Sequence, residues 1–110
     1  IMDIGNNKLL VMERSFSTGR LACTIKIFMV DLNDAEDISS INSLKNNPPQ
    51  KPLRKKLLLN LDELGIYTDN VEGMCLGPRL KNGKRSLWMI ADNNFSALER
   101  TQLFLFEVNE

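Results

Sequence analysis

Histidine is absent from the 110 residues of this chain. Its absence removes Ser-His-Asp and Cys-His catalysis from within the chain, together with the commonest protein ligand of zinc and iron. Lys+Arg and Asp+Glu both number 14, so no excess positive charge favours nucleic acid as a partner. No apolar run reaches the roughly 18 residues that a membrane-spanning helix needs. The segment Ile1–Gly5 has no charged leader, so no signal peptide is predicted.

Cysteine is also scarce, because Cys23 and Cys75 are the two in the sequence. A structural zinc site needs about four ligands with paired spacing, which two distant cysteines do not provide. The pair is compatible with one disulfide or with two separate thiols. Buried thiols are the more common state for cysteines in apolar strands, and we expect them here.

Alternating and continuous apolar runs predict strands and almost no helix. The expected strands cover residues 8–16, 22–32, 56–61, 71–77, 86–92 and 101–108. Turns are expected at Ser17–Arg20 and at Asn82-Gly83, which is a hairpin signal. Residues 42–56 contain three prolines and several basic side chains, so they are predicted to form a loop. The polar segment Asn33–Ser39 is expected to hold a short helical turn capped by Asp31 or Asn33.

The order of these elements predicts an all-β chain of antiparallel strands arranged as three strands, a loop and three strands. Two segments with similar endings, Ile27–Leu32 and Leu103–Val108, suggest a repeated unit. Several strands are apolar on both faces, which the stacked blades of a β-propeller require. A β-sandwich fits the strand number but more often shows clean alternation. We therefore expect a single partial propeller domain over residues 1–110, about one and a half to two blades.

Polar side chains at the strand ends form the candidate site. Glu72, Asp92 and Asn93 fall at the ends of two expected strands that follow one another in the chain. Carboxylate and amide oxygens there could bind a hard cation such as calcium, or polarise a water for hydrolysis. The alternative is turn chemistry, since Asp and Asn accept hydrogen bonds from nearby backbone amides.

Further charged residues are weaker candidates. Glu13 and Arg14 close an apolar strand and could reach a central pocket, or form a simple surface ion pair. Arg79, Arg85 and Arg100 could bind a phosphate or carboxylate through the guanidinium fork, although scattered surface arginines are common. The run from Gly83 to Ser86 lacks the earlier glycine and the Ser/Thr after lysine that a phosphate loop needs.

Several short segments, in order along the chain, resemble the C-terminal part of the family called esterase-like activity of phytase, which comprises phytase-like β-propeller proteins. The matching segments are Leu10–Ser17, Lys56–Leu59, Asn70–Met74, Gly77–Leu80, Asp92–Phe95 and Arg100–Phe104. The resemblance implies a propeller fold and an exported protein, periplasmic or extracellular. It also implies hydrolysis of phosphoric or carboxylic esters, with calcium as the cofactor.

Carried onto this sequence, the resemblance places Glu13, Arg14, Glu72, Asp92 and Asn93 on the channel side, and Arg100 is a further candidate for that side. A propeller site is built from several blades around one axis, so we expect these residues alone to be inactive as an enzyme. The alternative is a non-catalytic propeller that acts as a binding or scaffold module. Because an open ring exposes strand edges, we also expect the isolated chain to associate with itself.

Overall fold

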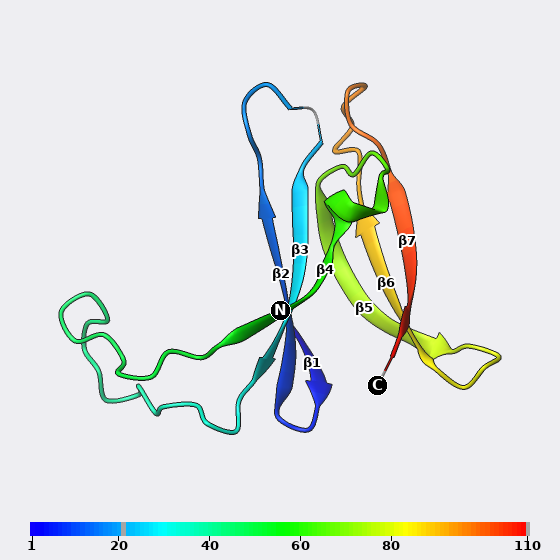
Figure 1. The fold of residues 1–110 in the computed structure, drawn as a ribbon. Helices are drawn as coiled ribbons and strands as arrows, with labels where there is room; N and C mark the ends of the chain where they lie inside the picture. The colour runs from blue at the N-terminus through cyan, green and yellow to red at the C-terminus, as the bar shows by residue number, and fades with distance from the viewer. Residues whose placement is uncertain (21, 110) are drawn as a thin grey trace. The chain divides into compact units, whose positions relative to one another are not determined.

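The computed structural model describes residues 1–20 and 22–109, and residues 21 and 110 of the predicted domain lie outside this part. The described chain is all-β, with two antiparallel sheets and almost no helix (Figure 1). The first sheet has the order β1-β2-β3-β4 and the second β5-β6-β7. The strands are Met2–Gly5 (β1), Lys8–Ser15 (β2), Thr24–Asp31 (β3), Lys55–Asn60 (β4), Val71–Arg79 (β5), Arg85–Ala91 (β6) and Gln102–Val108 (β7).

The structure confirms the all-β class and all six predicted strands, each within two residues at either end. Strand β1 was not predicted. The short helical turn expected at Asn33–Ser39 does not form; the Asp31 carboxylate instead accepts the amide of Asn33 in a tight turn, at 2.9 Å. A 3-10 helix, η1, forms at Leu61–Leu64, where only a connection was expected.

The chain divides into two compact units, described here one at a time. Unit 1 contains residues 1–12 and 27–59. Its β1–β2 hairpin turns at Asn6-Asn7, and both residues have a φ of 55°, the left-handed conformation that two-residue hairpin turns require. Leu10, Ile27 and Val30 are its buried apolar side chains. The predicted loop follows β3, and Glu36 fastens it by accepting the amide of Lys51 at 2.9 Å.

Unit 2 contains residues 13–26 and 60–110. Strand β6 lies between β5 and β7, and both pairings are antiparallel. The predicted turn at Asn82-Gly83 joins β5 to β6, with Gly83 at a φ of 82°. The buried apolar side chains of this sheet come from all three strands: Val71, Leu87, Met89, Ala91 and Phe104.

Antiparallel pairing places two sets of strand ends at opposite ends of the unit 2 sheet. Strand β5 begins and β6 ends at the paired residues Val71 and Ala91. Strand β7 begins at Gln102, which is also paired with Ala91. The loops before β5, after β6 and before β7 therefore meet at one end of this sheet, and the Asn82-Gly83 turn lies at the other. Among the described residues, no helix has the length and hydropathy of a membrane span.

Candidate functional site

A buried carboxylate organises the end of unit 2 where β5 begins. Asp69 is 3% exposed. Its Oδ1 accepts the amide of Asn70 at 2.8 Å, and its Oδ2 accepts the amide of Arg100 at 2.7 Å and the hydroxyl of Tyr67 at 3.3 Å. A buried charge is stable when hydrogen bonds surround it in this way. Asp69 therefore holds the loop before β7 against the loop before β5.

Gln102 makes the same connection from β7. Its Oε1 accepts the amide of Asp69 at 2.7 Å, and its Nε2 donates to the carbonyl of Tyr67 at 2.9 Å. The guanidinium of Arg100 lies over the Tyr67 ring, 4.7 Å from its centroid. Burial raises the pKa of the Tyr67 phenol, and the negative charge of Asp69 raises it further. We call Tyr67, Asp69, Arg100 and Gln102 the Asp69 cluster.

Thr68 lies in the same loop, but its side chain, unlike those of Tyr67 and Asp69, does not join the hydrogen bonds of the cluster. It is 1% exposed, and within the described part of the chain its hydroxyl has no hydrogen-bond partner. Its carbonyl does have one, because it accepts the amide of Cys23 at 3.0 Å. The loop before β5 is thus fastened through its backbone to the residues that precede β3.

A second, more exposed set of polar groups adjoins the Asp69 cluster. Arg14 donates from Nη1 to Asn70 Oδ1 and to Glu72 Oε1, the latter at 2.6 Å. Asn70 also donates from Nδ2 to the same Glu72 oxygen at 2.9 Å. The Arg14 and Glu72 side chains are 44% and 51% exposed, so solvent reaches both. We call these three residues the Arg14 cluster.

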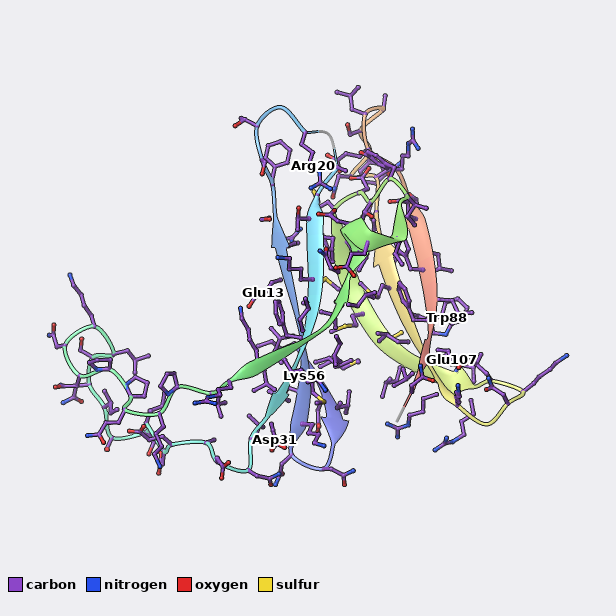
Figure 2. The ribbon with its side chains drawn as sticks, in the orientation of Figure 1. Glu13, Arg20, Asp31, Lys56, Trp88 and Glu107 are labelled. Carbon is purple, nitrogen blue, oxygen red and sulfur yellow. The ribbon has the colours of Figure 1, made fainter. Side chains whose placement is uncertain are left out.

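Another charged pair in unit 2 has a purely structural geometry. Arg20, labelled in Figure 2, donates to both carboxylate oxygens of Asp62, with Nη1 to Oδ2 at 3.1 Å. Thr24 donates to Asp62 at 3.2 Å and accepts from Arg20 at 2.9 Å. The hydrogen bond from Arg20 lowers the pKa of Asp62, and the same bond raises the pKa of Arg20. This network connects the turn after β2 to η1, and the charges of Arg20 and Asp62 neutralise each other.

The structure brings some of the sequence-predicted residues together and leaves others in turns. Arg14 and Glu72 form one cluster, and Arg100 joins the neighbouring one. Glu13 lies exposed on β2. Asp92 accepts the amide of Asn94 at 2.6 Å and Asn93 accepts the amide of Phe95 at 3.2 Å, which is the turn chemistry considered as the alternative.

The described residues do not complete a metal site by themselves. No three His, Cys, Asp or Glu side chains in residues 1–20 and 22–109 are grouped so that they could hold an ion. Calcium takes six to eight oxygen ligands, more than Glu72, Asp92 and Asn93 provide, and one oxygen of Glu72 already faces a guanidinium. A calcium site at this end therefore needs oxygens from other segments.

The two cysteines are unpaired thiols. Cys23 is half-buried, and burial raises the pKa of its thiol. Cys75 is exposed, so the expectation of a buried thiol was wrong for this residue. The reason is its place in β5: Cys75 is paired with Trp88 of β6 and stands on the face opposite its neighbour Met74, which is paired with the buried Met89.

Sequence reasoning missed Asp69, Asn70 and Gln102, which carry most of the hydrogen bonds at this end. Tyr67 to Asn70 is a polar run before a strand, and such a run usually signals a solvated loop. The one sequence signal was the position of this run, which lies immediately before an apolar strand and close after Gly65. In the structure Gly65 has a φ of 66°.

The two antiparallel sheets define an all-β protein, and each sheet is compatible with a blade of a β-propeller. The chain belongs to the phytase-like family, described as esterase-like activity of phytase, whose family model matches residues 1–95. This match confirms the resemblance inferred from the sequence. No curated protein and no solved structure is significantly similar to the chain.

Proposed function

We propose that the protein acts as part of an ester hydrolase of the phytase-like family, with small phosphoric or carboxylic esters as substrates. The supporting observation is the solvent-exposed Arg14 cluster at the strand ends of unit 2, in a chain whose family is described by esterase-like activity. Propellers contain about four to eight blades. The two sheets described here correspond to at most half of such a ring, so the active site needs further strands.

The Arg14 cluster contains two kinds of group that ester hydrolysis uses, a cation that can bind an oxyanion and a carboxylate that can act as a general base. Within residues 1–20 and 22–109, the hydrogen bonds of Arg14 to Asn70 and Glu72 both use Nη1, so the guanidinium keeps further N–H groups with which to bind an oxyanion. Oxyanion stabilisation of this kind is commonly the largest single contribution to hydrolysis. Glu72, half-exposed beside Arg14, is placed to accept a proton from an attacking water. Asn70 holds both side chains in this arrangement.

The test of this proposal is turnover of chromogenic phosphate and carboxylate esters by these 110 residues and by a longer chain that carries them. Hydrolysis by the longer chain alone is expected, because the remaining blades complete the site. The ester class that is hydrolysed identifies the substrate. Turnover of neither ester by either protein would contradict the proposal.

Calcium is part of the proposal, bound by Glu72, Asp92 and Asn93 with oxygens from other blades. Calcium should raise the melting temperature of the longer chain, because a ligand that binds only the folded state stabilises it, by about 2.7 kcal/mol at 100 times its Kd. Glu72→Gln and Asp92→Asn should each reduce the shift, and the exposed control Asp34→Asn should retain it. Scanning calorimetry with and without calcium measures this. An equal shift in all variants would show that these residues are not the ligands.

The second candidate function is a non-catalytic binding or scaffold module. It is favoured by the internal hydrogen bonds of Glu72, Asp92 and Asn93, since each already accepts from a neighbour. On this alternative the same residues only stabilise strand ends. Absence of ester turnover, together with an intact fold, would support it.

We also propose that the protein is exported and that the chain on its own associates through its strand edges. Strands β5 and β7 are edges of the second sheet. Leu103 and Leu105 on β7 are 63% and 50% exposed. Unpaired edges bearing apolar side chains promote strand addition. Sedimentation of the isolated chain at high micromolar concentration should therefore show dimers or larger species, and a strictly monomeric species would contradict this.

A further inference from the structure

The hairpin at the end of unit 2 opposite the polar clusters is strongly basic. The hairpin that joins β5 to β6 carries four cationic residues within seven positions and no acidic one: Arg79, Lys81, Lys84 and Arg85. The turn is well defined, because Gly83 donates to the Leu80 carbonyl and Leu80 to the Lys84 carbonyl, both at 2.8 Å. These backbone hydrogen bonds define the positions on the hairpin from which the four cationic side chains extend.

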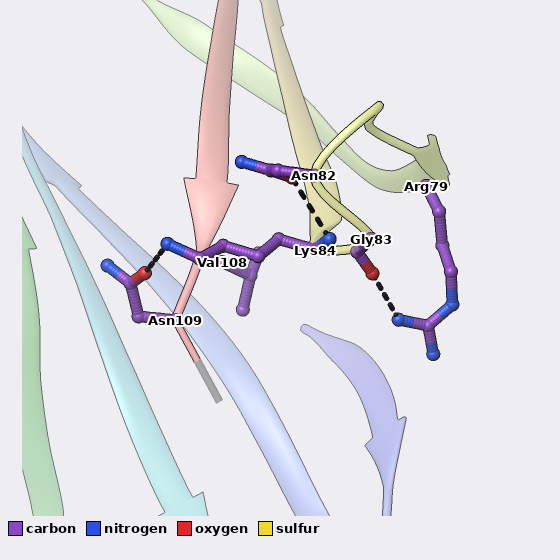
Figure 3. Close-up of a pocket in the computed structure, with 6 residues that line it drawn as sticks. All are labelled: Arg79, Asn82, Gly83, Lys84, Val108 and Asn109. Atoms are coloured by element: carbon purple, nitrogen blue, oxygen red, sulfur yellow. Dashed lines mark hydrogen bonds between the residues drawn. The ribbon is translucent and has the colours of Figure 1, made fainter.

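An open hollow of about 350 Å³ lies against this hairpin (Figure 3). Its lining combines charged, amide and apolar groups: Arg79, Asn82, Gly83, Lys84, Val108 and Asn109. Figure 3 shows the Arg79 guanidinium and the Lys84 ammonium directed to different sides, with the Val108 side chain close to the Lys84 stem. The volume falls in the lower part of the range for small-molecule pockets.

The two cations of the hollow differ in how they are neutralised. Lys84 forms an ion pair with Glu107 and also donates to Asn109 Oδ1 at 2.8 Å. The hydrogen bond from Lys84, and a second from Asn82, lower the pKa of Glu107, which therefore keeps its negative charge. Arg79 donates from Nη1 to the Gly83 carbonyl at 2.7 Å. Among the described residues, no carboxylate pairs with Arg79.

We propose that this hollow binds an organic phosphate monoester, with the phosphate on Arg79 and the organic group against Val108 and the methylenes of Lys84. The planar guanidinium binds phosphate oxygens two at a time, and the surrounding cations favour a dianion over a monoanion. Val108 and the Lys84 stem supply the apolar surface that an organic group needs. The site is distinct from the Arg14 cluster, since it lies at the other end of β5.

The test is a titration of the 110-residue chain with phenylphosphonate, a stable analogue, followed by backbone amide resonances in NMR. Saturable shifts are expected at residues 79–84, 108 and 109. Arg79→Gln should weaken binding at least fivefold, whereas Lys81→Gln, which removes a charge from the same hairpin outside the hollow, should change it less than twofold. Glu107→Gln should tighten binding at least twofold, because it releases Lys84 and removes a competing negative charge.

Three comparisons keep the inference open to refutation. Methylphosphonate should bind at least threefold more weakly than phenylphosphonate, and benzoate more weakly still. Equal weakening in Arg79→Gln and Lys81→Gln would overturn the proposal, because it would show a diffuse charge effect. Shifts confined to the Arg14 end, or tighter binding of benzoate, would also overturn it. The titration measures binding and not ester turnover, so its result does not depend on whether the proposed hydrolysis is correct.

Discussion

Replacing Gly77 by alanine should destabilise the protein by about 2–3 kcal/mol, the upper range for overpacking a filled site. A Cβ at this position would lie 2.6 Å from Ser86 Oγ, and closer still to Nε1 and Cδ1 of the Trp88 ring. These neighbours cannot move freely, because Trp88 donates to Ser86 at 3.2 Å and Ser86 donates to the Pro78 carbonyl at 2.6 Å. Thermal unfolding should show a melting temperature lower by about 10 °C or more.

Gly73→Ala is the matched control, since Gly73 lies on the same strand and also faces β6. Its new Cβ would meet Ile90 Cγ2 at 2.5 Å, but Ile90 is 45% exposed, so its side chain has room to rotate about χ1. We therefore expect a cost of about 1 kcal/mol. Gly77→Ala should cost less stability when it is added to Trp88→Leu than when it is added to the wild type, because the indole ring that the new Cβ would meet is then absent. Equal melting temperatures for Gly77→Ala and the wild type would refute the packing described here.

Asp69→Ala should cost about 3 kcal/mol of stability. The change leaves the amides of Asn70 and Arg100 and the hydroxyl of Tyr67 without their acceptor in a buried position. Each buried polar group without a partner costs about 1–3 kcal/mol, and the three are not independent. Urea unfolding measures the loss, and hydrogen exchange of the Arg100 amide should accelerate because the loop before β7 opens locally.

Asp92→Ala is the corresponding control at the same end of the sheet. Asp92 is exposed and accepts one backbone amide, so its removal should cost about 0.5 kcal/mol. Asp69→Asn should fall between the two, because an amide oxygen retains part of the acceptor function. If Asp69→Ala and Asp92→Ala lost equal stability, the Asp69 cluster would not be the element that holds this end together.

The all-β fold could be predicted from the sequence because its strands are apolar on at least one face and separated by clear turn residues. Strand β1 was missed because it has four residues, of which only Met2 and Ile4 are apolar. The signal for it was Asn6-Asn7, a pair suited to a two-residue hairpin turn. The helical turn at Asn33–Ser39 was wrong because Asp31 bonds to a local amide and closes a turn instead.

The candidate site could be predicted only in part. Arg14 and Glu72 were identified as charged residues at strand ends, and the structure joins them. Asp69 was not, because its role depends on burial and on a partner loop 31 residues away in sequence, near Arg100. Likewise, the sequence does not show that Asp92 and Asn93 accept hydrogen bonds from amides two residues ahead.

The most direct test of the account compares ester hydrolysis by Arg14→Gln and by Arg54→Gln in the longer chain that carries these residues. Arg54 is an exposed arginine in the loop before β4 and serves as the matched control. If Arg14 binds the developing oxyanion, Arg14→Gln should lower kcat/KM at least tenfold, and Arg54→Gln should change it less than twofold. Equal kcat/KM values for the two variants would contradict the placement of the substrate at the Arg14 cluster.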